Sequence, residues 1–229
     1  MIDKNFQLTF DLYGEESFNR DDFIISNSNK DALAWIDSWP AWPKNVSGLN
    51  IFGARSSGKT HLANIWKSKA NALSITSPLL DLVNLRKLLE SHENVLIDNF
   101  DSSWKDEPIL HLYNLMQEVG GTLVIVSEKP ASQIDIKLRD LASRVSTMTT
   151  VELKPPDDEL IKGVMRKLFK DRQIEVPSEV VNYLTIRMER SFKEVSRMVD
   201  RLDKTSLSEK NAITLSLARR ILQENIKKE

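Results

Sequence analysis

One stretch of the chain constrains its fold more than any other, and it reads Gly53-Ala54-Arg55-Ser56-Ser57-Gly58-Lys59-Thr60. A glycine, four free positions and then Gly-Lys-Thr are the pattern of a phosphate-binding loop. Glycines let the backbone turn tightly, so that successive N–H groups converge on phosphate oxygens. In such loops the lysine reaches the β- and γ-phosphates and the threonine hydroxyl binds Mg²⁺. The alternative interpretation is a glycine-rich turn whose lysine is only solvated.

The residues on either side of this loop favour the first interpretation. Leu49–Phe52 has the short apolar pattern of a buried strand, and a helix is expected to begin at Thr60 and to run over His61–Lys69. The N-terminal end of a helix carries partial positive charge and therefore favours bound phosphate. The sequence thus predicts that Gly53–His61 binds ADP or ATP together with Mg²⁺.

The composition is that of an ordinary globular protein, with 41% apolar and 28% charged residues in a chain of 229. No apolar run approaches the roughly 18 residues that a membrane span needs, and Met1–Asn5 does not resemble the start of a secretory signal. We therefore expect no contact with a membrane. The absence of cysteine excludes disulfides, thiol catalysis and cysteine-bound metals, and it suits the cytoplasm.

Charge gives little support for direct binding of nucleic acid. The net charge of the chain is −1, and the residues from Lys154 onward carry only a small excess of basic side chains. Such an excess is more often a solvated face than a DNA footprint.

Strand and helix patterns alternate through the first two thirds of the chain. Further strands are expected at 72–76, 95–98, 122–127 and 149–153, with helices at about 78–89, 108–119 and 138–144. This alternation predicts an α/β fold, a parallel sheet with helices on both faces. The fold class is thus that of a P-loop nucleotide-binding sheet followed by a small helical lid.

Polar residues at the strand ends are candidates for the nucleotide site. Asp98 ends a buried strand that we expect beside the phosphate loop, where a carboxylate helps to hold Mg²⁺. Asn99 follows it, and because an amide cannot act as a general base we expect slow ATP turnover. Ser127 ends the next strand, where it would lie beside Asp98 and sense the γ-phosphate.

Three domains are expected: a tail at 1–20, a nucleotide-binding core at 21–154 and a lid at 155–229. Lys154-Pro155-Pro156 marks the hinge, because neither proline can continue a helix. Four helices are expected in the lid, at about 157–172, 178–188, 192–204 and 214–226. In the core, a helix over 31–36 is expected to stop at Trp39-Pro40-Ala41-Trp42-Pro43, whose tryptophans would cover an edge of the core.

The tail contains Gln7-Leu8-Thr9-Phe10-Asp11-Leu12, in which Leu8, Phe10 and Leu12 alternate with polar residues. One interpretation is a short strand packed on the core. The other is an extended peptide that offers apolar anchors to a partner.

The order of these features resembles the AAA+ ATPases: phosphate loop, strand ending in Asp, sensing strand, Leu141-Ala142-Ser143-Arg144 on a helix, and helical lid. Within them the chain is most similar to the DnaA branch, and there to the Hda-like regulators of the alphaproteobacterial type. The residues that carry this resemblance are Trp39–Pro43, Ile97–Asn99, Leu138–Arg144, Arg201–Lys204 and Gln7–Leu12.

The resemblance implies partners and roles. Gln7, Leu8, Phe10 and Leu12 would dock in the sliding clamp of DNA polymerase III, so that DNA is met only through the clamp. Arg144 would act in trans as an arginine finger on ATP bound to the initiator DnaA, which limits re-initiation of replication. Lys193 would face the nucleotide from the lid. On sequence alone, Arg144 is also compatible with a surface salt bridge.

The chain departs from the family pattern at several points. Lys193 stands where a nucleotide-sensing arginine is expected, and Phe10 stands where the clamp peptide often has leucine. The sequence ends near the close of the lid, so we do not expect the DNA-binding domain of an initiator. Two other functions remain open, a helicase-loader type of remodelling ATPase and an adaptor whose nucleotide is only structural.

Overall fold

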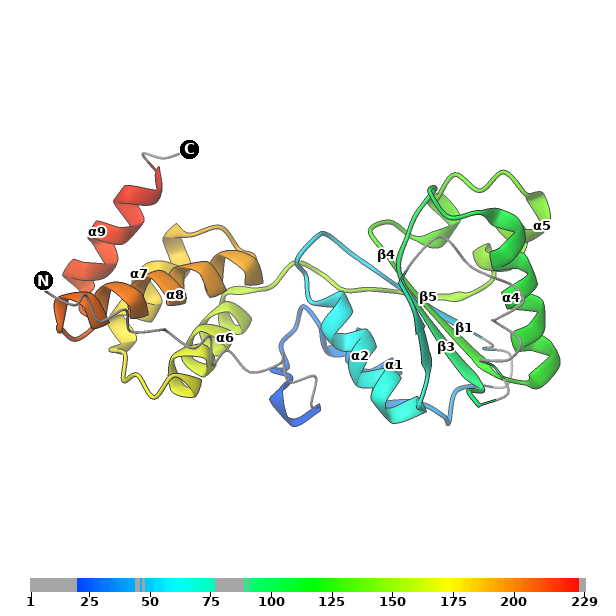
Figure 1. Cartoon of the computed structure of the whole chain (residues 1–229), viewed down its shortest axis with the longest axis horizontal. Coiled ribbons are helices and arrows are strands. Elements are labelled where there is room, and N and C mark those ends of the chain that lie inside the picture. The colour runs from blue at the N-terminus through cyan, green and yellow to red at the C-terminus, as the bar shows by residue number, and fades with distance from the viewer. Residues whose placement is uncertain (1–19, 44–45, 47, 77–88, 90, 227–229) are drawn as a thin grey trace, which may run out of the picture.

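The computed structural model describes residues 20–43, 46, 48–76, 89 and 91–226. They form two parts, an α/β core and a bundle of helices that follows it in the chain (Figure 1). The expected tail at 1–20 falls almost wholly outside the described residues, as does the helix expected over 78–89.

A five-stranded sheet organises the core. Its strands are β1 (Gly48–Phe52), β2 (Leu73–Ile75), β3 (Asn94–Phe100), β4 (Thr122–Ser127) and β5 (Thr149–Glu152), and their spatial order is β2-β3-β4-β1-β5. All four pairings are parallel. The predicted parallel α/β sheet is therefore confirmed.

One detail of the predicted sheet is wrong. We expected the strand that ends in Asp98 to lie beside the phosphate loop, but β4 lies between β3 and β1. The β4 strand pairs with β1 through Leu49↔Val124 and with β3 through Ile97↔Ile125. Its five consecutive apolar or buried positions suit a central strand covered on both faces.

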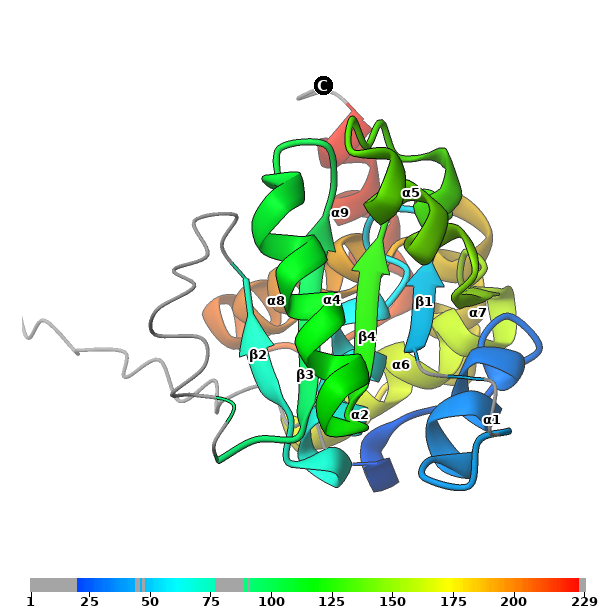
Figure 2. The same cartoon turned by 90° about the vertical axis from the view of Figure 1, so that its right-hand side faces the viewer.

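The helices of the core cover both faces of the sheet. On one face lie α1 (Lys30–Ser38) and α2 (Lys59–Ala70), and on the other lie α4 (Asp106–Val119) and α5 (Arg139–Ser146), which stand in front of the sheet in Figure 2. Successive side chains of a strand point to opposite faces. Accordingly Leu96 and Val124 pack with α2 residues, whereas Ile97 and Ile125 pack with α4 and α5 residues.

The second part consists of α6 (Asp158–Asp171), α7 (Ser178–Arg187), α8 (Phe192–Glu209) and α9 (Leu215–Ile226) around its own apolar core. The prediction of four helical segments here is confirmed. The α8 helix runs five residues beyond the expected end at Lys204, and Lys210 closes it in the left-handed region with a φ of 54°. A left-handed residue with backbone hydrogen bonds to the last turn is a common helix terminator.

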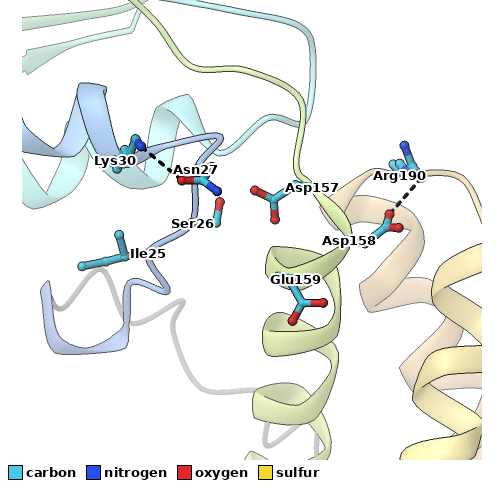
Figure 3. A pocket seen from close by; sticks show the side chains of 8 residues that line it. All are labelled: Ile25, Ser26, Asn27, Lys30, Asp157, Asp158, Glu159 and Arg190. Atoms are coloured by element: carbon cyan, nitrogen blue, oxygen red, sulfur yellow. Dashed lines mark hydrogen bonds and ion pairs between the residues drawn. The ribbon is translucent and has the colours of Figure 1, made fainter.

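Asp157 ties the lid to the core at the segment before α1. Its Oδ1 accepts a hydrogen bond from the Leu160 amide (2.8 Å), which caps α6, and its Oδ2 accepts one from the Ser28 amide (3.2 Å). Ser28 also accepts from the Lys154 amide through its carbonyl (3.2 Å). Figure 3 shows Asp157 pointing toward Ser26, and both residues line a cavity of about 740 Å³ at this seam. The lid is thus attached by hydrogen bonds as well as by the chain itself.

Among the helices that the structure describes, none has the length and apolar content required to cross a bilayer.

Candidate nucleotide-binding site

The phosphate loop connects β1 to α2, as the motif predicts. A Cβ on Gly53 would lie 2.2 Å from the Leu153 carbonyl oxygen, so only glycine fits where the loop passes the end of β5. Gly58 has a φ of +95°, a conformation that side chains disfavour, and it is the N-cap of α2. The α2 helix begins at Lys59, one residue before the expected Thr60. The loop therefore directs the start of a helix at the site.

Lys59 lies inside this loop. Its Nζ donates hydrogen bonds to the carbonyl oxygens of Gly53 (2.8 Å) and Ala54 (2.7 Å), and only 9% of the residue is exposed. Burial lowers the pKa of Lys59 below its ordinary value, while the carboxylates of Glu128 and Asp98 oppose that shift. A buried ammonium group is stabilised by any anion that reaches it, so this position suits a phosphate.

Ser57 supplies a second observation that fits a phosphate. Its hydroxyl oxygen is buried and, among the described residues, has no hydrogen-bond partner. Buried polar groups are normally satisfied, and a hydroxyl in the middle of a phosphate loop can donate to a phosphate oxygen.

Residues from the ends of β3 and β4 complete the core side of the site. Asp98 is buried and accepts a hydrogen bond from the Asn99 amide (2.9 Å). Asn99 has a φ of +56°, which asparagine tolerates better than most residues, and its side chain is exposed. The β3 strand continues past this irregularity to Phe100, two residues beyond its expected end.

Ser127 lies next to β3, as expected, but its hydroxyl is already engaged. Its Oγ accepts from Asn50 Nδ2 (2.9 Å) and donates to the Lys129 carbonyl oxygen (2.7 Å). Asn50 also accepts a hydrogen bond from the Ala131 amide (2.9 Å) and is fully buried. This network shapes the turn after β4, and a direct contact between the Ser127 hydroxyl and a phosphate would have to break part of it.

A cleft of about 2370 Å³ runs from the phosphate loop along the lid. It exceeds the roughly 300–1,000 Å³ of an ordinary ligand pocket, because it includes the open groove between the two parts. The predicted residues that line it are Arg55, Ser56, Ser57, Gly58, Lys59, Thr60, His61, Asn99, Ser127 and Lys193.

The lid meets the loop at the start of α8. Phe192 lies against Gly58, where a Cβ would come within 3.0 Å of its ring, and the exposed Lys193 follows it. On the opposite side, the rings of Phe23 and His61 lie 5.4 Å apart and both residues line the cleft. Together these rings offer apolar surface near a phosphate site, which suits a nucleotide base.

Three contributions to the cleft escaped the sequence analysis. Phe192 directly precedes Lys193, which was expected to face the nucleotide, so its position in the sequence could have indicated a place in the cleft. No sequence pattern indicates Phe23 as a cleft residue, because its contact with His61 joins segments that are far apart in the sequence. The third is the ion pair between Arg55 and Glu128: the segment Ser127–Pro130 was expected at the site, but a pair between residues so far apart in sequence has no local pattern.

Arg144 is not among the residues that line this cleft, within the part of the chain that the structure describes. It lies on α5, where its Nε donates to Asp140 Oδ1 (3.0 Å) and its guanidinium stands over the ring of Tyr113. The clamp-peptide residues Gln7, Leu8, Phe10 and Leu12 lie outside the described residues.

Mg²⁺ would depend on the nucleotide for most of its ligands. Among the described residues, no group of three or more His, Asp or Glu side chains is arranged to hold a metal ion. Mg²⁺ in nucleotide sites is typically held by one or two protein oxygens together with phosphates and water. Of the two residues predicted for this role, Thr60 lines the cleft, whereas Asp98 is buried and is not among the described residues that line it.

This chain is similar in sequence to replication initiator proteins and to one lid-domain family. The family model "Hda, lid domain" matches residues 158–222. The chromosomal replication initiator protein DnaA of Nautilia profundicola is 26% identical over 229 residues, which cover 90% of this chain and 52% of that protein. This chain therefore spans about half the length of such relatives.

Solved structures agree on the fold. Domain III of the Thermotoga maritima initiation protein DnaA superposes with a TM-score of 0.76 at 21% identity, covering 92% of this chain and 97% of that one. AMPPCP-bound DnaA from Aquifex aeolicus gives a TM-score of 0.72 at 16% identity, over 94% of this chain and 72% of that one. The core and the lid thus share their fold with these DnaA structures.

Proposed function

We propose, from the premise that this chain is an Hda-like, DnaA-related AAA+ protein, that it binds an adenine nucleotide and stimulates hydrolysis of ATP held by a DnaA initiator. The stimulation takes place on the sliding clamp and limits re-initiation of chromosome replication. The protein therefore acts on the nucleotide of another protein more than on its own.

Nucleotide binding is supported by the fit of the phosphate loop. An anion at one place is favoured by the buried Lys59 ammonium, by the start of α2 and by the Ser57 hydroxyl, which has no partner within the described part of the chain. ADP or ATP would bind Gly53–His61 with its Mg²⁺ at Thr60 and Asp98, while Lys193 faces it from the lid. The bound Mg²⁺ would supply charge neutralisation between phosphates.

The observation that carries the proposal is the position of Arg144. It lies outside the cleft of its own chain, on α5, and its side chain is 37% exposed. An arginine finger supplied from a neighbouring molecule stabilises the charge that builds up on the γ-phosphate oxygens during transfer. Arg144 is available for this role toward a neighbour, and an initiator with the same fold is a suitable neighbour.

Asn99 supports a regulator over a fast ATPase. An amide cannot take a proton from the attacking water, so intrinsic turnover is expected to be slow. The nucleotide would then stay bound and order the site, because it is hydrolysed only slowly.

The clamp is the second partner that we propose. Gln7, Leu8, Phe10 and Leu12 would dock in its apolar pocket, and DNA would be contacted only through the clamp. This part of the proposal relies on the family resemblance of the tail.

The test is single-turnover hydrolysis of ATP preloaded on the initiator, with DNA-loaded clamp present. Arg144→Ala should retain nucleotide and clamp binding and lose stimulation, since arginine fingers contribute about 10³- to 10⁵-fold in rate. Arg144→Lys should fail nearly as badly, because an ammonium lacks the planar fork of a guanidinium.

Arg139→Ala is the matched control, since it removes the same charge from an exposed position of the same helix. It should stimulate like the wild type. Full stimulation by Arg144→Ala would remove Arg144 from the mechanism.

A further inference from the structure

Two side chains from different helices contact Arg144. Asp140, one turn earlier on α5, accepts a hydrogen bond from Arg144 Nε at 3.0 Å. Tyr113, on α4, places its ring centroid 5.7 Å from the guanidinium carbon of Arg144. This distance lies within the roughly 6 Å at which a cation is attracted to the face of an aromatic ring.

These two contacts involve different atoms of Arg144. The carboxylate of Asp140 accepts from Nε, and the guanidinium carbon lies over the ring of Tyr113. A guanidinium has five N–H donors, and among the described residues the terminal NH₂ groups of Arg144 form no hydrogen bond. That edge is the one that binds phosphate oxygens in a bidentate manner.

Tyr113 is itself held firmly. It is 8% exposed and packs in the core cluster that contains Met116, Leu141 and Val145. A free arginine side chain samples many rotamers, and this freedom is lost when the side chain is fixed. A ring anchored in the core limits that freedom before any neighbour arrives.

We propose that Tyr113 is a positioning residue for Arg144, presenting the terminal edge of its guanidinium to a nucleotide bound by the neighbouring molecule. This inference rests on the proposed function of Arg144 as a finger. The ring face supports the guanidinium, while the edge that meets phosphate stays open.

Two substitutions separate this role from simple filling of the core. Tyr113→Phe keeps the ring face and most of the volume, whereas Tyr113→Leu keeps an apolar side chain and removes the face. Small displacements of a reacting group can cost about 100-fold in rate. We therefore expect Tyr113→Leu to lower the maximal rate of initiator-bound ATP hydrolysis about tenfold or more, and Tyr113→Phe to stay within about twofold.

The concentration of this protein that gives half-maximal stimulation should change little in either variant, because the buried ring of Tyr113 is not expected to touch the initiator itself. Met116→Ala is the matched control, since it opens the same core on the same helix without touching Arg144. It should stay within about twofold of the wild type once folded protein is compared at equal concentration.

A variant with pentafluorophenylalanine at position 113 keeps the shape of the ring and reverses its electrostatic face. This variant tests the same role if Tyr113→Leu does not fold. Its maximal rate of initiator-bound ATP hydrolysis should be as low as that expected for Tyr113→Leu. Equal stimulation by the phenylalanine and pentafluorophenylalanine variants would overturn the proposal.

Proton NMR gives a readout that does not depend on the initiator. The Nε–H signal of Arg144, assigned by its loss in Arg144→Lys, should show a ring-current shift in wild type and Tyr113→Phe and lose it in Tyr113→Leu. If Arg144→Ala stimulates normally, the proposed function fails while this shift still reports the contact. If Arg144→Ala is inactive and Tyr113→Leu is as active as Tyr113→Phe, the positioning role alone fails.

Discussion

At the scale of single residues, Lys59 is the side chain on which the proposed nucleotide binding depends most. Burial lowers its pKa, with Glu128 and Asp98 acting against that shift, so the folded chain holds a cation that an anion would stabilise. Lys59→Ala removes the cation and should abolish the stabilisation that nucleotide gives. For wild type, that stabilisation is about 2.7 kcal/mol at a hundredfold excess over Kd.

The measurement is the melting temperature with and without Mg²⁺ and ADP or ATP. Lys67→Ala is the control, because it removes a lysine from the far end of the same helix. Wild type and Lys67→Ala should both show the shift. An equal shift in Lys59→Ala would contradict a phosphate site at this loop.

Where a local motif defines a short stretch of chain, the sequence predicts its backbone conformation. The spacing of Gly53, Gly58 and Lys59 was sufficient to predict a loop between β1 and α2, because all three residues lie close together in the sequence. The hydroxyl of Ser127 shows the limit, since its partners Asn50 and Lys129 come together only in the folded sheet. Tyr113 beneath Arg144 is a second contact of this kind, between two helices separated by a strand.

At the scale of elements, the kinds of strands and helices followed from periodicity, whereas their neighbours did not. Apolar runs identified β3 and β4 as buried strands, and Pro155 and Pro156 marked the break before α6. The placement of β4 between β3 and β1 depends on pairing between distant segments, which no local pattern encodes. No local pattern predicted the extension of β3 to Phe100, which follows a register shift at the left-handed Asn99.

The N-cap of α6 gives a prediction at this scale. Asp157 caps the helix and also holds Ser28 of the core. Asp157→Ala should destabilise the protein by roughly 0.5–2 kcal/mol, the usual cost of losing such a cap, and should also weaken nucleotide binding in the cleft. Thr214→Ala is the control, because Thr214 caps α9 through the Leu217 amide within the lid (3.3 Å). An equal loss of nucleotide affinity in both variants would contradict a hinge role.

The dependence of this contribution on pH has a definite sign. Burial alone would raise the pKa of Asp157, but hydrogen bonds from the Leu160 amide, the Ser26 hydroxyl and other donors outweigh it and hold the pKa below its ordinary value. A carboxyl whose pKa is lower when folded stabilises the protein fully above its unfolded pKa of about 3.9. That stabilisation is lost as the pH falls through the folded pKa. The difference in melting temperature between wild type and Asp157→Asn should therefore shrink below about pH 4.

At the scale of the whole molecule, the core and the lid line the cleft proposed for the nucleotide, and within the described ranges Arg144 is not part of that lining. The order of motifs along the chain predicted both parts, because each part buries its own apolar cluster. Their meeting at Gly58 and Phe192 could not be predicted, since it depends on the angle at which the hinge sets the lid.

The tail supplies the last prediction, since it is the part proposed to bring the nucleotide cleft and Arg144 to the clamp. Leu8, Phe10 and Leu12 alternate with polar residues, so an extended peptide can turn all three toward one apolar pocket. A few buried anchors usually dominate the affinity of such an interface. Gln7→Ala combined with Leu8→Ala should therefore abolish clamp binding and leave the nucleotide-induced melting shift unchanged.

Thr9→Ala combined with Asp11→Ala is the matched control, because it changes the intervening positions that face away from such a pocket. Binding of each full-length variant to DNA-loaded clamp, measured by surface plasmon resonance, distinguishes the two interpretations of the tail. Loss of binding in the first variant and retention in the second would support a docked peptide. Normal clamp binding by Gln7→Ala with Leu8→Ala would favour a strand packed on the core, and Arg144 would then have to reach the initiator without the clamp.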